Sequence, residues 1–253
     1  MPGDEIEILL MLPTAYYKFG VIYAVQINAT LWRIELEYGV ASGDPLFNST
    51  NNLYKSTTGM SKEYIYNERR LLQEVKSHGV TVEKYEYYGL GRRIKVIRGN
   101  ETTINLYLGN DIIYEKTTSG NQVTREIDYI VINGVYIAKI VKEGNNQSQI
   151  YYYHTDSVGT VKAVTDARGQ IVKTFEYDEF GNVTMETGSI IEKPRFTGKP
   201  LDSTGLYYFN ARYYDPTIGR FISADPAKEG LNWYAYCNNN PLMFVDPDGR
   251  RVD

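Results

Sequence analysis

Three Asp-Pro pairs in the C-terminal third of the sequence begin at Asp215, Asp225 and Asp246. Asp246 follows Asp225 by 21 residues, which matches the spacing of an aromatic repeat in this chain. The repeat therefore predicts that these two carboxylates lie side by side on adjacent windings of one structure. A close carboxylate pair shares a proton, because both groups cannot ionise cheaply at short range. One carboxyl can then act as general acid and the other as general base, as in aspartic proteases.

A structural interpretation competes with this chemistry. Asp-Pro pairs commonly begin turns, since the aspartate caps its own turn and proline fixes the next φ. Asp215-Pro216 needs no other explanation, and for Asp225 and Asp246 both interpretations stay open.

The sequence predicts no cofactor and no metal site. Its two histidines and the single cysteine, Cys237, form no zinc-type cluster, and Cys237 is expected to be a buried filler. The chain has no nucleophile elbow, phosphate loop or complete dinucleotide fingerprint. The arginine pairs at 69–70 and 92–93 are interpreted as a solvated edge of a sheet.

Composition excludes several classes of protein. The net charge of −4 over 253 residues provides no basic surplus for nucleic acid. No apolar run approaches the roughly 20 residues of a membrane span, and the acidic N-terminus lacks the basic region of a signal peptide. The sequence as printed is therefore expected to be soluble, and cytoplasmic before any export.

An aromatic repeat organises the chain. The stretch "FEYDEFGNV" at 175–183 aligns without a gap with "YEYYGLGRR" at 85–93, and "YIYNERRLL" at 64–72 is a third copy. Each copy predicts a β-hairpin, and stacked hairpins predict an all-β fold with a spiralling antiparallel sheet. The alternative is an ordinary β-sandwich with coincidental spacing. The aromatic marks of the repeat are Tyr66, Tyr87, Tyr107, Tyr129, Tyr153 and Phe175.

Three segments are predicted along the chain. Residues 1–50 are rich in β-forming residues but lack the repeat, residues 51–150 carry hairpin repeats, and residues 151–253 differ in their motifs. Within the repeats, Asn133-Gly134 predicts a two-residue type I′ turn. One short helix is expected near "PAKEGLNWYAY" at 226–236.

Residues 151–249 resemble the Rhs repeat-associated core domain. The phrases "GLYYFNARYYDPTIGRFISADP" and "NNNPLMFVDPDG" carry this resemblance by their order and spacing. The earlier repeats resemble the tyrosine/aspartate (YD) repeats of Rhs proteins, Tc toxin C components and teneurins. The resemblance implies a β-strand spiral that forms a hollow shell, in the bacterial toxins around a C-terminal toxin.

The resemblance also implies self-cleavage just after the final DPxG motif, by two aspartates and an arginine. Carried over to this sequence, these residues are Asp225, Asp246 and Arg220, the arginine holding the charged carboxylate or the carbonyl oxygen under attack. Arg250 stands where the family usually has leucine. Implied partners are a C-terminal toxin cargo, absent from this chain, or secretion-apparatus proteins, and the implied location is secreted or at the cell surface.

Two functions stay open. The first is a fragment or short member of the Rhs family, forming part of the shell and plug of a polymorphic toxin, with a vestigial aspartate autoprotease. The second is a non-enzymatic module at the cell surface whose tyrosines bind carbohydrate or protein. Convergence of Asp225 and Asp246 with Arg220 within hydrogen-bond reach would favour the first function. Aspartates that cap separate turns facing apart would favour a binding or purely structural role.

Overall fold

The computed structural model describes residues 55–56, 62–89, 91–228 and 232–252. The segment predicted at 1–50 lies outside these residues. In these residues, thirteen strands form one sheet, three short strands form a second sheet, and two 3₁₀ turns complete the regular structure that is described. The elements are β1 (Lys55–Ser56), β2 (Lys62–Tyr66), β3 (Leu72–Ser77), β4 (Val80–Tyr87), β5 (Arg93–Arg98), β6 (Glu101–Leu108), β7 (Asp111–Ser119), β8 (Gln122–Ile132), β9 (Val135–Glu143), β10 (Gln149–Thr155), β11 (Val161–Asp166), β12 (Ile171–Tyr177), β13 (Val183–Thr187), η2 (Phe196–Gly198), β14 (Tyr207–Tyr208), β15 (Tyr213–Asp215), β16 (Arg220–Phe221) and η3 (Cys237–Asn239).

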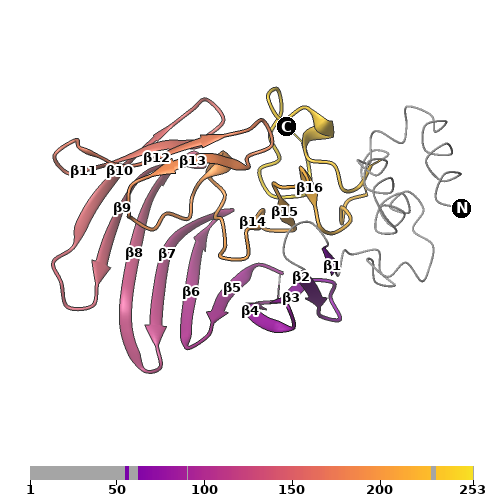
Figure 1. The fold of residues 1–253 in the computed structure, drawn as a ribbon, viewed down its shortest axis with the longest axis horizontal. Coiled ribbons are helices and arrows are strands. Elements are labelled where there is room, and N and C mark those ends of the chain that lie inside the picture. The colour runs from indigo at the N-terminus through magenta and orange to yellow at the C-terminus, as the bar shows by residue number, and fades with distance from the viewer. Residues whose placement is uncertain (1–54, 57–61, 90, 229–231, 253) are drawn as a thin grey trace, which may run out of the picture.

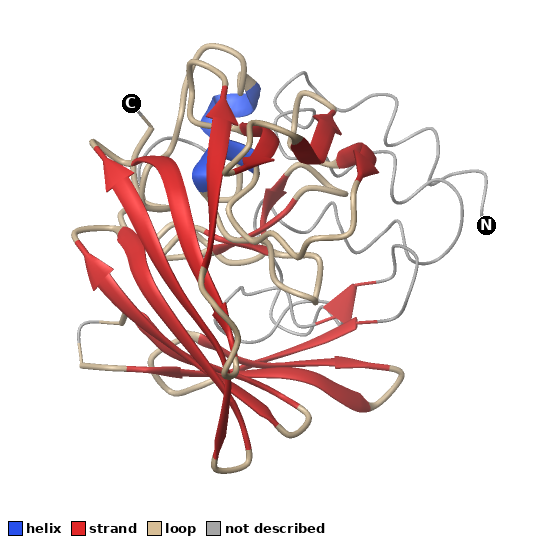
Figure 2. Cartoon of the chain, turned by 90° about the vertical axis from the view of Figure 1, so that its left-hand side faces the viewer, coloured by secondary structure: helices blue, strands red, loops and turns tan. Residues whose placement is uncertain are grey.

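The large sheet is a continuous antiparallel meander, in which each strand pairs with the next along the chain. It curves strongly, and the short strands and loops of the C-terminal segment, which follows β13, lie against one end of it (Figure 1). The view from the side shows the strands fanning out below the short strands and loops of that segment (Figure 2). The described residues therefore form the predicted winding β-sheet, and the β-sandwich alternative is wrong. The sheet runs through residue 150 without a break, since strand β10 spans that predicted boundary.

Two-residue turns close several hairpins as the sequence predicted. Asn133 and Gly134 join β8 to β9 with φ of 51° and 80°, the left-handed conformation that a type I′ turn requires at both positions. His78 and Gly79 close β3 and β4 in the same way, with φ of 50° and 79°. These primed turns match the right-handed twist of the strands and hold the meander in register.

Tyrosines of the repeat mark β-bulges. At each bulge the strand register shifts, and a bulged strand bends. The Tyr107 hydroxyl donates a hydrogen bond of 2.6 Å to the Arg93 carbonyl, which belongs to the first residue of the preceding strand. Tyr87 makes the same bond to Leu72, and Tyr177 makes it to Val161. The bulged tyrosines are Tyr66, Tyr87, Tyr107 and Tyr177.

The predicted aromatic series combines two different positions of this repeat. Tyr129, Tyr153 and Phe175 stand two residues before their bulges, as Tyr64 and Tyr85 do. All five of these rings are buried in the core. The repeat unit therefore contains one ring that fills the core and, two residues later, a bulge position where tyrosine can bind the backbone.

Asx turns follow the bulges and complete the repeat. The Asp178 carboxylate accepts hydrogen bonds from the backbone N–H groups of Phe180 and Asn182, at 3.0 and 2.9 Å. Asp156 and Asn67 cap their own turns with the same pattern. The tyrosine and aspartate of the repeat thus have separate roles: one binds across the bulge, and the other closes the turn.

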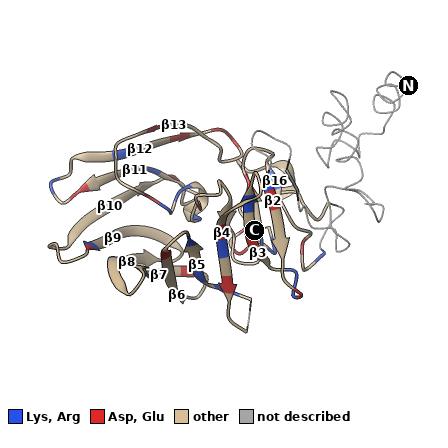
Figure 3. Ribbon diagram, turned by 60° about the horizontal axis from the view of Figure 1, so that its bottom comes forward, with Lys and Arg blue, Asp and Glu red and all other residues tan. Residues whose placement is uncertain are grey.

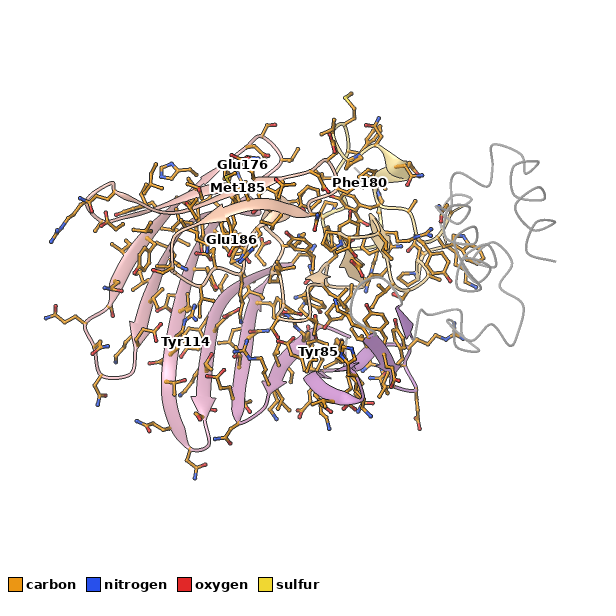
Figure 4. All side chains as sticks on the ribbon, in the orientation of Figure 1. Tyr85, Tyr114, Glu176, Phe180, Met185 and Glu186 are labelled. Carbon is orange, nitrogen blue, oxygen red and sulfur yellow. The ribbon has the colours of Figure 1, made fainter. Side chains whose placement is uncertain are left out.

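The C-terminal segment, residues 189–252, packs on the sheet through aromatic side chains. Tyr85 of β4 packs against Tyr213 of β15 with ring centroids 5.1 Å apart, and Figure 4 shows Tyr85 where the sheet meets this segment. Phe180, in the turn after β12, lies beside the same segment (Figure 4), and its carbonyl accepts a hydrogen bond of 2.7 Å from the Tyr214 hydroxyl. A separate aromatic cluster inside the segment includes Phe209, Phe221 and Tyr236.

The prediction of a solvated sheet edge at 92–93 is wrong for Arg93. This side chain is 1 % exposed and binds Asp202 with both terminal nitrogens, one of them 3.1 Å from Oδ1. Its guanidinium carbon also lies 4.3 Å from the centre of the Tyr208 ring. The burial arises because the C-terminal segment covers β5, and local sequence does not report that long-range contact.

The predicted helix at 226–236 is also wrong for the residues of that stretch that the structure describes. Ala227 and Lys228 instead form a turn capped by Asp225, and Ala235 pairs with Arg220 in an isolated β-bridge. Aspartate before proline favours such a turn over a helix.

Charges of both signs are distributed along the strands (Figure 3). Within the described residues, no helix is long and apolar enough to cross a membrane.

Candidate functional site

The final Asp-Pro motif forms a tight turn around one buried carboxylate. Asp246 is 1 % exposed, and its Oδ1 accepts hydrogen bonds from the backbone N–H groups of Gly249 and Arg250, at 2.8 and 3.1 Å. Gly249 has φ of 76°, and a Cβ at this position would lie 2.5 Å from the Phe209 carbonyl oxygen. Both the backbone conformation and the space therefore require glycine here.

Arg212 is the arginine that binds this turn. Arg212 lies in the loop between β14 and β15, where its backbone carbonyl accepts a hydrogen bond from the Phe209 N–H. Its Nη2 lies 3.1 Å from Asp246 Oδ2, and its Nε donates a hydrogen bond of 2.5 Å to the Gly249 carbonyl oxygen. The guanidinium also stacks on Phe221, with 3.6 Å from Cζ to the ring centre. Arg212 therefore contacts both the carboxylate and the carbonyl of the bond that follows the motif.

Asp225 is linked to the same arginine through a shared hydrogen-bond acceptor. The Trp233 carbonyl oxygen accepts hydrogen bonds from Arg212 Nη1 at 2.9 Å and from the Asp225 backbone N–H at 2.8 Å. Asp225 is 6 % exposed, and its Oδ1 also accepts the Ala227 N–H at 2.9 Å. The two aspartates thus cap separate turns, and both act electrostatically on Arg212.

Burial dominates the electrostatics of this group. Burial raises the pKa of Asp246, while Arg212 and the backbone N–H groups of the turn oppose the rise. Burial lowers the pKa of Arg212, and the carboxylates of Asp225 and Asp246 oppose that change. The site therefore contains one enclosed cation with two carboxyls, of which Asp246 is shifted toward its acid form.

Arg220 lies elsewhere. Its guanidinium is 5.7 Å from the ring centre of Tyr234, a residue of the cluster between the sheet and the C-terminal segment. The next residue, Phe221, packs under Arg212, and neighbouring residues of a strand point to opposite faces. The contacts that the sequence assigned to Arg220 are therefore made by Arg212.

The sequence analysis chose Arg220 instead of Arg212 because the phrase "GLYYFNARYYDPTIGRFISADP" contains both arginines and does not by itself distinguish their roles. The available signal was the alternation along "GRF": Phe221 is apolar and faces the core, so its neighbour Arg220 must face the other side. This alternation shows that Arg220 and Phe221 face opposite sides, but it does not show which cluster the Arg212 side chain packs in.

The proposed reason for the pairing of the aspartates is also wrong. Asp225 and Asp246 do not lie on adjacent windings of the sheet, since both belong to the loops that follow β16. Their 21-residue spacing has no connection with the repeat. Asp215 is a turn residue as predicted, because its Oδ1 accepts the N–H and the hydroxyl of Thr217 at 3.0 and 2.6 Å.

The bond after the motif lies next to a surface cavity of about 450 Å³. Asp248 and Arg250 form one wall, and the turns after β4 and β6 form the other. The Arg250 side chain is exposed. Among the residues that the structure describes, no cluster of three or more His, Cys, Asp or Glu side chains could hold a metal ion.

Comparisons with known proteins agree with this architecture. The model of the family described as teneurin YD-shell matches residues 54–242. The tRNA3(Ser)-specific nuclease WapA of Bacillus spizizenii is 37 % identical over 182 residues, which cover 66 % of this chain and 7 % of that protein. Toxin subunit YenC2 of Yersinia entomophaga is 31 % identical over 188 residues, covering 66 % of this chain and 19 % of the subunit.

A solved structure has the same fold. The crystal structure of TcdB2-TccC3 superposes with a TM-score of 0.69 and 29 % identity, covering 83 % of this chain and 11 % of the matched chain. The chain thus spans less than a fifth of the length of each of these proteins. The matched family model covers most of the sequence, and the chain belongs to the teneurin YD-shell family.

Proposed function

We propose that this chain is the C-terminal end of a YD shell, and that its Asp225, Asp246 and Arg212 cleave the chain between Gly249 and Arg250. One observation carries the proposal: Arg212 Nε lies 2.5 Å from the Gly249 carbonyl oxygen while Arg212 Nη2 binds Asp246. A guanidinium in this position can stabilise negative charge that develops on that oxygen.

The two carboxyls can divide the proton transfers of a hydrolysis. A water molecule attacks the Gly249 carbonyl carbon, and Asp225 accepts the proton that the water loses. Arg212 neutralises the resulting oxyanion. In the structure the Arg250 N–H donates to Asp246 Oδ1 at 3.1 Å. Once the tetrahedral intermediate has formed, the Arg250 nitrogen carries a lone pair, and Asp246 in its acid form protonates it. The carbon–nitrogen bond then breaks, leaving a carboxylic acid on Gly249, which loses its proton to solvent, and a new amino terminus on Arg250.

Burial of Asp246 supports this division of roles. A general acid must be protonated near the working pH, and burial raises the pKa of Asp246 toward that range. Arg250, at the position where the resemblance implies leucine, does not obstruct the step. Its side chain is exposed and only its backbone N–H enters the turn.

The shell role rests on the fold and the relatives. YenC2 is a toxin subunit by name, and TccC3 is named in the structure of a Tc holotoxin pore; this chain matches only a part of each. We infer that the segment is one end of a longer shell whose cleaved downstream chain is the cargo. Secretion, display at the cell surface and contacts with a secretion apparatus stay expectations of the resemblance.

The binding-module alternative has less support from the structure. Among the tyrosines of the described region, only Tyr88 and Tyr152 are more than a third exposed, at 37 % and 42 %. Most of the other tyrosines there fill the core or bind the backbone, and the partly exposed Tyr114 and Tyr151 bind the side chains of Glu126 and Gln149. Few tyrosine rings therefore remain for flat contacts with a sugar or a protein.

The test is the intact mass of the chain fused through Asp253 to a folded reporter. The parent fusion should release the reporter with a new amino terminus at Arg250, and D225N, D246N and R212K should keep it whole. R220K and D215N are the matched controls and should cleave like the parent. A parent that stays whole while folded by circular dichroism would end the proposal, and loss of cleavage in R220K but not R212K would return the role to Arg220.

A further inference from the structure

Both loops of the proposed cleavage site are tied to one turn of the large sheet. The Asn210 side-chain amide, in the loop that carries Arg212, donates a hydrogen bond of 3.1 Å to the Asn110 carbonyl oxygen. Asn110 lies in the turn between β6 and β7, next to Asp111 at the start of β7. The Asn110 carbonyl therefore supports the arginine side of the site.

Lys199 connects the same turn to the aspartate side. Its Nζ donates a hydrogen bond of 2.6 Å to the Pro247 carbonyl oxygen, inside the Asp246-Pro247-Asp248-Gly249 turn. Backbone bonds hold Lys199 on both sides, since its N–H donates to Phe196 and its carbonyl accepts from Arg195. The lysine is thus fixed by η2 and reaches the motif from outside its own turn.

The charged groups around Lys199 belong to the sheet and to the turn of the final Asp-Pro motif. Asp111 faces it from the sheet, and Asp246 and Asp248 face it from the motif. Arg92 acts on Asp111 and Arg212 acts on Asp246. Because electrostatic attraction is mutual, the Lys199 cation favours the ionised form of Asp246 and opposes the effect of burial.

We propose that Lys199 is a positioning residue of the cleavage site, and that it couples cleavage to docking of the C-terminal segment on the β6–β7 turn. This inference rests on the proposed self-cleavage for its rate effect, although the positioning itself does not. When the segment is not docked, Lys199 loses Asp111 and Asn210 loses Asn110, so the Gly249 carbonyl and Arg212 are no longer aligned. The chain would therefore stay uncleaved until the C-terminal segment has docked and the shell wall is complete.

The first experiment measures reporter release from the fusion over a range of pH. Removal of a hydrogen bond to a charged group predicts cleavage about 10- to 100-fold slower in K199M, with K199R restoring most of the rate. The pH of half-maximal cleavage should also rise in K199M, because Asp246 then keeps its proton to higher pH. K95M is the matched control: Lys95 pairs with Glu86 on the sheet, where both side chains are partly exposed, so this variant removes a lysine without breaking a bond between the segment and the sheet.

The second experiment does not depend on cleavage. Hydrogen exchange at the amides of 249–251 is measured in the uncleavable D225N background. These amides bind Asp246, so they should exchange at least about 10-fold faster in K199M, and K95M should leave their exchange unchanged. Unchanged exchange in K199M, or equal effects of K199M and K95M on rate and exchange, would overturn the inference. A parent fusion that does not cleave, with exchange as expected, would refute the proposed function and leave the positioning role established.

Discussion

The Arg93–Asp202 ion pair should be a major contribution to the stability of the interface between the sheet and the C-terminal segment. Arg93→Met removes the cation and leaves Asp202, whose side chain is 3 % exposed, without a counterion. Glu83, which is also buried, acts on the same carboxylate and worsens the imbalance. Loss of one partner of a buried ion pair costs about 3–5 kcal/mol, and this is the expected loss in the free energy of unfolding.

The assay is urea unfolding followed by circular dichroism, comparing midpoints at equal m-values. Lys95→Met is the matched control on the same strand, because Lys95 pairs with Glu86 where both side chains are partly exposed, at 32 % and 51 %. That pair should contribute about 0–1 kcal/mol. The double variant R93M/D202L should recover much of the loss, since an apolar pair can replace a buried ion pair. A loss in R93M no larger than that in K95M would refute the reasoning.

Three further predictions follow from individual contacts. Tyr87→Phe loses hydrogen bonds to the Leu72 carbonyl and the Tyr213 hydroxyl and should lower the free energy of unfolding in urea by about 1–2 kcal/mol. The Tyr114 hydroxyl binds the Glu126 side chain, so Tyr114→Phe should cost less. Equal losses would contradict the bulge role. Gly249→Ala places a Cβ 2.5 Å from the Phe209 carbonyl and should stop reporter release, while Gly134→Ala, with no atom within 4 Å of its Cβ, should not. Burial and Glu83 raise the pKa of Asp202 to about 6 from 3.8, so the folded state loses stability as pH rises between these values. Glu83→Gln should reduce that loss. If the urea midpoint of Glu83→Gln fell as steeply from pH 4.5 to 7 as that of the parent, the effect would be excluded.

Local features of the fold were predictable from the sequence. Two-residue alternation, the Asn133-Gly134 turn and the recurring aromatic residues all act within a hairpin, so they are visible in a window of about 20 residues. The aspartate turns follow the same rule, since Asp178 and Asp215 bind backbone groups only two to four residues away. The winding antiparallel sheet follows from these local signals repeated along the chain.

The site needed more than local signals. The choice between Arg212 and Arg220 depends on which side of β16 faces the final motif, and the burial of Arg93 depends on a partner 109 residues later. Similarly, Asp225 and Asp246 both act on Arg212 because two loops pack around that arginine, and their spacing along the repeat has no part in it. The sequence by itself determined the hairpins and their turns, because those are set by neighbouring residues. Only the tertiary structure decided which charges are enclosed and paired, because the desolvation that makes such pairs necessary arises when the C-terminal segment covers the sheet.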